Sequence, residues 1–164
     1  MSKLNFLLAS AIGLLSALAV VTPATAGAVV KVTLTDKGGT MDLSKSMGLG
    51  LGMHADMKAA IMGISINPKS VPAGKVKFNV TNSSTATVHE MIVAPIADEN
   101  VVMPFNANDN KVDEEASHDL GEVSELDPGK SGTLVVDMKP GKYLLYCNVS
   151  GHFMAGMWTV LIVK

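Results

Sequence analysis

Four residues of the chain combine the side-chain types that bind copper in a one-electron centre. Cys147, His152 and Met157 offer a thiolate, an imidazole and a thioether within eleven residues, and His89 adds a second imidazole about sixty residues earlier. Two imidazoles and a thiolate in a trigonal arrangement, completed by a long axial methionine, are the ligands of a mononuclear blue-type copper site. The four residues therefore predict that the chain binds one copper ion and moves one electron at a time.

The chemistry of the donors explains why these residue types belong together. A soft thiolate and thioether favour Cu(I), imidazoles accept either oxidation state, and a geometry between the two preferences needs little rearrangement when the electron moves. The spacing requires a strand that ends at Cys147 and a loop that turns back toward the ion. Ser150 and Gly151 supply turn residues for that loop, and we expect Gly156 to let the backbone pass close to the metal.

Two of the four positions leave an alternative open. A lone cysteine near a strand end is often a small buried apolar residue, but an unpaired thiol in an exported chain is a liability unless it is metallated or buried. Met154 lies in the same loop and is a second candidate for the axial position, and Met157 beside Trp158 would also suit core packing. We favour Cys147 and Met157 as ligands.

The C-terminal run YLLYCNVSGHFMAGM resembles the ligand loop of the cupredoxins. The four-residue gaps on both sides of His152 are most similar to rusticyanin-like and auracyanin-like members. In that family the first histidine follows an asparagine-containing turn at the start of a strand, which matches residues 82–88 followed by His89. The resemblance covers roughly residues 64–164, and it implies type 1 copper, a β-sandwich fold and electron transfer through His89, Cys147, His152 and Met157.

Two further expectations come with this resemblance. Several cupredoxins have Asn or Ser directly after the first histidine, where this chain has Glu90, and we expect Glu90 and Asn148 to make the equivalent link to the cysteine loop. The second histidine of similar proteins presents an exposed edge within an apolar patch. Here the patch would surround His152 and would suit brief docking of a redox partner such as a cytochrome, an oxidase or a reductase. Its other expected members are Phe153, Met154, Ala155, Pro95, Met103 and Pro104.

The N-terminus has the layout of a secretory signal. Lys3 precedes an apolar stretch over residues 4–21, and Ala24, Thr25 and Ala26 form a small-residue cleavage site. We therefore expect residues 1–26 to be a signal peptide and residues 27–164 to be a single domain, exported to the periplasm. Without cleavage, the apolar stretch approaches the roughly 20 residues that span a bilayer and would act as an N-terminal anchor.

Composition excludes one class of partner. The chain has 13 Lys and Arg residues against 15 Asp and Glu residues, a formal net charge of −2, and no arginine. A mildly acidic chain without the residue that binds phosphate by a bidentate fork does not favour nucleic-acid binding. A second apolar run long enough for a membrane helix is absent from the sequence, so stable membrane insertion after cleavage is not expected.

Short apolar or alternating stretches between turn signals predict an all-β protein, a Greek-key sandwich of two sheets. Alternation is clearest over 75–80, where lysines and an asparagine alternate with apolar residues. The copper ligands would then lie in the loops at one end of the sandwich, where a rigid scaffold usually displays function. The predicted strands are 29–34, 61–66, 75–81, 88–94, 132–138, 142–147 and 157–163.

A glycine- and methionine-rich insertion over residues 38–62 interrupts the strand pattern. One interpretation is a short helix whose apolar face, with Met53 and Met57, packs over the sandwich. The other is a second, weaker Cu(I) site, because thioethers and an imidazole suit that ion. The candidate donors are Met41, Met47, Met53, His54, Met57 and Met62.

Two other functions remain open at this point. A periplasmic copper chaperone or copper-resistance protein would use the methionine-rich insertion as its main site. A domain of a multicopper oxidase or a copper nitrite reductase would need further histidine pairs, and the chain has four histidines and no His-x-His motif. The sequence therefore favours an electron carrier that is not an enzyme.

Overall fold

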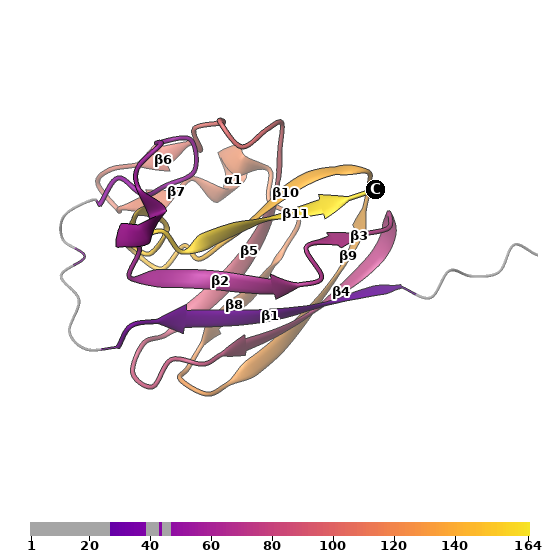
Figure 1. Ribbon diagram of the computed structural model, residues 1–164, viewed down its shortest axis with the longest axis horizontal. Coiled ribbons are helices and arrows are strands. Elements are labelled where there is room, and N and C mark those ends of the chain that lie inside the picture. Colours follow the sequence, from indigo (N-terminus) through magenta and orange to yellow (C-terminus); the bar gives the residue numbers. More distant parts are fainter. Residues whose placement is uncertain (1–26, 39–42, 44–46) are drawn as a thin grey trace, which may run out of the picture.

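Strands dominate the computed structural model, which describes residues 27–38, Leu43 and 47–164. The predicted signal peptide and Met41 lie outside the described residues. Two sheets face each other and a small hairpin lies beside them (Figure 1). This arrangement confirms the predicted β-sandwich.

The first sheet has the strand order β2-β1-β4-β9, in which β1 and β4 run parallel and the other neighbours antiparallel. Its strands are β1 (Ala28–Asp36), β2 (Met62–Asn67), β4 (Gly74–Asn82) and β9 (Ser131–Met138). The second sheet has the order β3-β11-β10-β5-β8 and pairs antiparallel except for β3 with β11. Its strands are β3 (Ser70–Val71), β5 (His89–Ile96), β8 (Glu122–Leu126), β10 (Gly141–Tyr146) and β11 (Trp158–Val163).

Shorter elements lie at one end of the sandwich. They are the hairpin of β6 (Phe105–Asn106) and β7 (Lys111–Val112), the helix α1 (Glu114–Ser117) and the single 3-10 turns η1 (Met57–Ala59) and η2 (Phe153–Ala155). Asp113 caps α1 by accepting from the backbone N–H of Ala116, and Asp56 caps η1 in the same way from Lys58. Within the described residues, no helix is long and apolar enough to cross a membrane.

All seven predicted strands form, with ends that differ by at most two residues. The alternation in β4 is real, because Val76, Phe78 and Val80 are buried while Lys75 and Lys77 are exposed. β8 was missed. It is an edge strand with the sequence EVSEL, and its acidic residues hide the alternation that a half-buried strand usually shows.

The second sheet is buried on both faces, which decides where the ligand loop can lie. Alternate residues of β5 and β10 enter two separate cores: Met91 and Leu145 pack in the main core between the sheets, whereas Ile92 and Tyr146 pack in a second core on the outer face. The second core includes Leu51, Met103, Val112, Phe153 and Met154. The loops around the ligand loop therefore form a third layer over the sandwich.

The methionine-rich insertion contains the short helix that was expected, but only as the single turn η1, and no residue of that turn is buried. The apolar helix face predicted for Met53 and Met57 does not form, because Met57 is exposed while Met53 packs against the second core. Met62 belongs to β2 and packs in the main core. These methionines therefore lie in different surroundings.

Candidate metal centre

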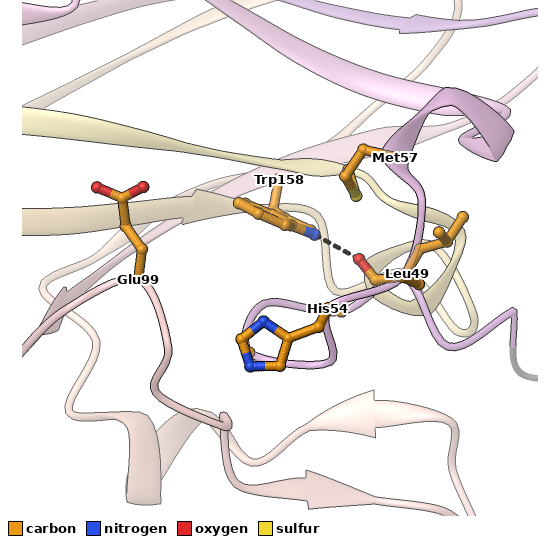
Figure 2. A pocket seen from close by; sticks show the side chains of 8 residues that line it. Leu49, His54, Met57, Glu99 and Trp158 are labelled. Carbon is orange, nitrogen blue, oxygen red and sulfur yellow. Dashed lines mark hydrogen bonds between the residues drawn. The ribbon is translucent and has the colours of Figure 1, made fainter.

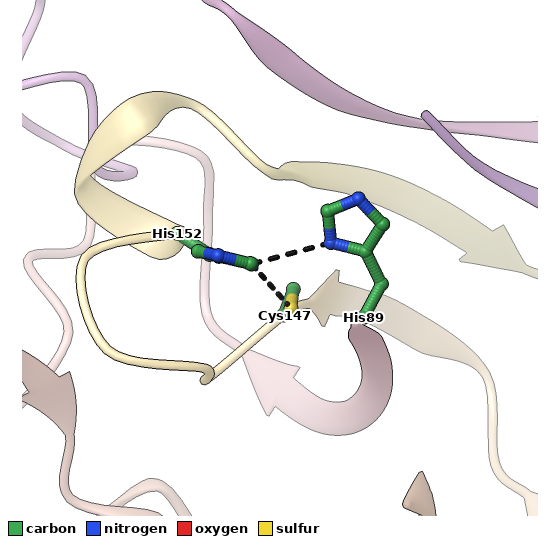
Figure 3. A group of neighbouring side chains, drawn as sticks. All are labelled: His89, Cys147 and His152. Atoms are coloured by element: carbon green, nitrogen blue, oxygen red, sulfur yellow. Dashed lines mark hydrogen bonds between the residues drawn. The ribbon is translucent and has the colours of Figure 1, made fainter. Parts of the chain in front are cut away.

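His89, Cys147 and His152 meet in a buried cluster at one end of the sandwich (Figure 3). His152 Nδ1 lies 3.2 Å from His89 Nδ1 and 3.3 Å from Cys147 Sγ, and the three donor atoms all lie within 4.8 Å of one another. Each of the three side chains is at most 2% exposed. Two imidazole nitrogens and a sulfur at this separation are placed to hold a single ion.

Strand pairing brings two of these residues together although they are far apart in the sequence. β5 begins at His89 and runs antiparallel to β10, which ends one residue before Cys147, so the start of one strand lies beside the end of the other. The backbone N–H of Cys147 donates to the carbonyl of Met157 at 3.1 Å and extends the pairing of β10 with β11. The returning loop then places His152 over this end of the sheet.

The ligand loop is held by hydrogen bonds at several points. Asn148 donates to the carbonyl of Val112 and to Glu114 Oε1, and its own Oδ1 accepts from the Val112 N–H at 2.7 Å. Ser150 donates to the Asp109 carbonyl, and the N–H of Gly151 donates to the Asn110 carbonyl. The loop therefore keeps its conformation through contacts with the β6–β7 hairpin and α1, which limits the movement of its ligands.

Burial also sets the protonation of the cluster. It raises the pKa of the Cys147 thiol to about 12, against the opposing effect of N–H groups from Glu90 and Val149, and it lowers the pKa of His152 to about 4 with help from His89. Neutral imidazoles are ready to bind a metal, and a cation is needed to stabilise the thiolate in this dry site. The donor set therefore fits one type 1 copper ion, which His89, Cys147 and His152 could hold.

The two candidate axial methionines lie in different cores. Met157 is fully buried in the main core together with Cys147, and its N–H donates to the His152 carbonyl. Met154 packs in the second core, where its Sδ lies 3.1 Å from the position that a Cβ on Gly50 would take. This difference supports Met157 as the axial ligand.

Glu90 is connected to the cysteine loop, as expected, but through backbone groups. Its N–H donates to Cys147 Sγ at 3.4 Å, and the Asn148 backbone N–H interacts with its carboxyl group. The side chain of Asn148 instead hydrogen-bonds to Val112 and Glu114. Burial, with repulsion from Glu122, raises the pKa of Glu90 to about 7.

Asp36 is a member of the site that sequence reasoning missed. Its Oδ2 lies 2.9 Å from His89 Nε2, and both side chains are almost completely buried, at 2% and 0% exposure. Asp36 is the last residue of β1, in the other sheet. The sequence carries no local signal for this contact, because the two residues are 53 positions apart and lie on strands that do not pair.

The expected exposed patch around His152 is wrong. His152, Phe153, Met154 and Ala155 are all buried, with at most 4% exposure. The reason is a cover formed by Leu43 and residues 47–53 of the insertion, which we call the cover segment. Its contacts include the Leu49 N–H donating to the Met154 carbonyl, Gly50 packed against Phe153, and Leu43 packed against Gly151.

Trp158 fastens the cover segment to the sandwich. Its Nε1 donates to the Leu49 carbonyl at 2.7 Å (Figure 2). Beside this bond, His54, Met57, Glu99 and Trp158 contribute to the lining of a pocket of about 110 Å³. Met53 and Met62 pack in two different cores, so these two methionines do not converge on one point, and a second Cu(I) site stays a prediction.

Gly156 packs closely against the insertion, and its expected approach to the metal stays a prediction. This residue has φ of +92° and ends η2, and a Cβ there would lie 2.7 Å from Ala60 Cβ and 3.2 Å from Met57 Cε. Glycine is therefore required by the left-handed conformation and by close packing against η1. The atoms nearest to this Cβ position belong to Ala60 and Met57 of the insertion.

Comparison with known proteins agrees with this geometry. The sequence profile of the Sulfocyanin (SoxE) domain matches residues 70–164, which is more than half of the chain. The chain belongs to the sulfocyanin family. Sulfocyanins are cupredoxins, so the predicted family is confirmed. The matched range contains His89, Cys147, His152 and Met157, whereas Asp36 and the cover segment lie before it.

Among solved structures, rusticyanin supports the fold of this sulfocyanin-family chain. Rusticyanin from Thiobacillus ferrooxidans is 15% identical with a TM-score of 0.52, and the match covers 83% of this chain and 76% of that one. Auracyanin from the photosynthetic bacterium Roseiflexus castenholzii is 23% identical with a TM-score of 0.45, covering 61% of this chain and 87% of that one. No curated protein sequence gives a significant match.

Proposed function

We propose that this sulfocyanin-family protein is an exported type 1 copper protein that carries single electrons between redox partners. The observation that carries the proposal is the buried cluster of His89, Cys147 and His152, with Met157 behind it in the same core as Cys147. Copper held by His89, Cys147 and His152 would supply a Cu(I)/Cu(II) couple for one-electron exchange between a reduced and an oxidised partner. Electron carriage without enzymatic catalysis is part of the same proposal.

The residues of the chain make this exchange fast by resisting movement. The Glu90 N–H donates to Cys147 Sγ, which fixes the sulfur, and the bonds of Asn148 and Gly151 fix the loop that carries His152. The cluster is dry because the two cores and the cover segment enclose it. Little ligand movement and little water reorientation keep the barrier to electron transfer low.

A redox partner must exchange its electron with a site that lies beneath the cover segment. Because His152 is buried, we propose that a redox protein docks transiently on the cover segment or beside it. Met47, Met57 and Val102 are exposed apolar residues of the segments around the ligand loop, at 36%, 40% and 62% exposure. A small apolar surface of this kind is typical of brief redox encounters.

Export to the periplasm rests on the sequence of residues 1–26, which has a charged start, an apolar stretch and a small-residue cleavage site. The test is the mass and N-terminal sequence of the protein isolated from an expressing bacterium after fractionation. A periplasmic product that begins at Gly27 would support export with cleavage. A membrane-bound product that retains residues 1–26 would support the anchor instead.

The central test is the visible spectrum of residues 27–164 titrated with Cu(II), then reduced and reoxidised. We expect an intense thiolate-to-copper band that saturates at one equivalent, bleaches with a mild reductant and returns on oxidation. Cys147→Ser should lose the band because it lacks the thiolate. Absence of the band in the unmodified protein, together with Cu(I) binding that survives in Cys147→Ser, would contradict the proposal and favour a methionine-based copper carrier.

A further inference from the structure

We propose that Asp36 is a positioning residue for the copper site: its carboxylate holds His89 in the tautomer and orientation that present Nδ1 to the metal, and favours Cu(II). This inference rests on the proposed function, because it assigns a role in the same site. It goes beyond the family match, which begins at residue 70 and does not include Asp36.

The geometry is that of a carboxylate that orients a metal-binding histidine. His89 uses one ring nitrogen for each neighbour: Nε2 lies 2.9 Å from Asp36 Oδ2, and Nδ1 lies 3.2 Å from His152 Nδ1 inside the cluster. A carboxylate can only accept, so Nε2 carries the proton and Nδ1 has a free lone pair. Histidine ligands are commonly fixed in this way by a group behind the ring.

Asp36 is itself held in place. Its Oδ1 accepts from the Gly38 N–H at 2.7 Å, and the hydroxyl groups of Ser84 and Thr87 also hydrogen-bond to the carboxylate. Burial alone would raise the pKa of Asp36, but hydrogen bonds from Ser84, His89, Gly38 and Thr87 outweigh it and lower this pKa. The group next to His89 is therefore a fixed negative charge.

The turn before β5 supplies this support. Asn82 Oδ1 accepts from the Ser84 N–H, and Ser84 Oγ accepts from the N–H groups of Ala86 and Thr87. The Ser83 N–H and hydroxyl both bond to the Leu34 carbonyl of β1. Thus hydrogen bonds join the turn before His89 to the strand that ends at Asp36. Together with the Asp36–His89 contact, they connect the two sheets at the end of the sandwich that holds the cluster.

A buried carboxylate behind a ligand has a definite effect on the two oxidation states. The negative charge stabilises the additional positive charge of Cu(II) more than it stabilises Cu(I), so it lowers the reduction potential. Loss of such a partner typically weakens metal binding by about 10- to 100-fold. A tenfold larger loss for Cu(II) than for Cu(I) corresponds to a rise of about 59 mV.

Two readouts test the proposal on Asp36→Ala, Asp36→Asn and the control Asp137→Asn. The control removes the same charge from an exposed position on β9. The first readout is ¹⁵N NMR of the His89 ring in the metal-free protein, at a pH where the ring is neutral. The second is the copper affinity and reduction potential of the loaded protein, with circular dichroism as a check on folding.

We expect the unmodified protein and Asp137→Asn to show the Nε2–H tautomer of His89. Asp36→Ala should show a mixture of tautomers, copper binding about 10-fold weaker or more, and a raised potential. In Asp36→Asn the amide NH₂ must face either the Gly38 N–H or His89 Nε2, so a shift toward Nδ1–H and a raised potential are both expected.

An Nδ1–H tautomer in the unmodified metal-free protein would overturn the proposal even if no variant folds. So would an Asp36→Asn protein whose tautomer and potential match those of Asp137→Asn. Failure of the proposed function looks different: the unmodified protein would show no thiolate-to-copper band. The tautomer of His89 is measured without metal, so it still tests the role of Asp36 in that case.

Discussion

Met157 and Met154 share one loop but differ in the core that each one enters. Met157 packs with Cys147 in the main core between the sheets, and Met154 packs against Gly50 in the second core. Met154 lies within η2, whereas Met157 follows Gly156, whose left-handed backbone ends that turn, and this separates the axial candidate from a packing residue. The sequence alone does not distinguish them, because both methionines lie in the loop that follows Cys147.

We predict that Met157→Leu keeps the thiolate-to-copper band but raises the reduction potential, since an axial thioether donates weakly to Cu(II) and leucine donates nothing. Met154→Leu is the matched control. It should leave the potential unchanged, and either exchange of Met for Leu should cost less than about 1.5 kcal/mol of stability. Voltammetry of both variants is the measurement. A potential that moves only in Met154→Leu would reverse the assignment of the axial ligand.

Glu90 gives the metal-free protein a pH dependence of known sign. Burial, followed by repulsion from Glu122, raises its pKa from 4.5 to about 7, although Lys111 and the Asn148 N–H oppose the shift and Glu114 adds to it. Between about pH 4.5 and 7 the folded chain binds more protons at Glu90 than the unfolded chain does. The contribution of Glu90 to stability therefore falls as pH rises through this window.

We predict that metal-free Glu90→Gln is more stable than the unmodified protein at pH 8, by about 1–3 kcal/mol. The difference should vanish near pH 4, where Glu90 is protonated in both states. Urea unfolding of both proteins at several pH values measures it. The comparison also removes the opposite slope that the lowered pKa of His152 gives to both proteins. A stability difference independent of pH would show that the titration of Glu90 is not its cause.

The cover segment is the element that most changes the site. It follows β1 and lies over the loop between β10 and β11. The Leu49–Met154 hydrogen bond joins it to that loop, and the Trp158–Leu49 hydrogen bond joins it to the start of β11. Gly52 lets it approach the next loop, since φ is +80° and a Cβ would lie 2.5 Å from the Val101 carbonyl oxygen. An element that would otherwise be a surface loop thereby becomes part of the enclosure of the copper site.

Gly52→Ala should displace the cover segment and destabilise the protein by about 1–3 kcal/mol, through steric overlap added to left-handed strain. Gly129→Ala is the control. Gly129 also has a left-handed φ of +74°, but a Cβ there would meet no atom within 4 Å, so this substitution should cost only the backbone strain of about 1 kcal/mol. Hydrogen exchange at the Leu49 and Gly151 amides should accelerate only in Gly52→Ala. Equal protection in both variants would mean that the segment does not depend on this close contact.

At the scale of the molecule, the proposed copper ligands connect parts of the fold that are far apart in the chain. His89 begins β5, Cys147 follows β10 and His152 lies in the next loop, while Asp36 reaches the site from the other sheet. An ion held by these groups stabilises the folded chain and not the unfolded one. Stability should therefore depend on copper.

We predict that copper removal lowers Tm by roughly 5–15 °C relative to protein at free copper one hundred times Kd, which corresponds to about 2.7 kcal/mol. Differential scanning calorimetry of loaded and chelated protein measures the change. Cys147→Ser should show little of this increment. An equal rise in Cys147→Ser would mean that the ion binds elsewhere, for example at the methionine-rich insertion.

The sequence by itself determined the seven main strands, the class of the fold and three residues that the structure brings into one cluster. Alternation and apolar runs predict strands because each strand must bury one or both faces, and thiolate with imidazoles is a ligand set that few other structures need. The acidic edge strand β8 was not predicted, because its apolar and polar residues alternate only weakly.

Only the tertiary structure decided that Asp36 supports His89, that Met154 and Met157 enter different cores, and that the insertion covers His152. The physical reason is the same in each case. Local pattern reports which faces of a segment are apolar, whereas these contacts depend on which distant segments pack against one another. Asp36 contacts His89 from the other sheet, and Leu49 contacts Trp158 although 109 positions separate them in the chain. The residues next to each partner in the sequence therefore do not predict either contact.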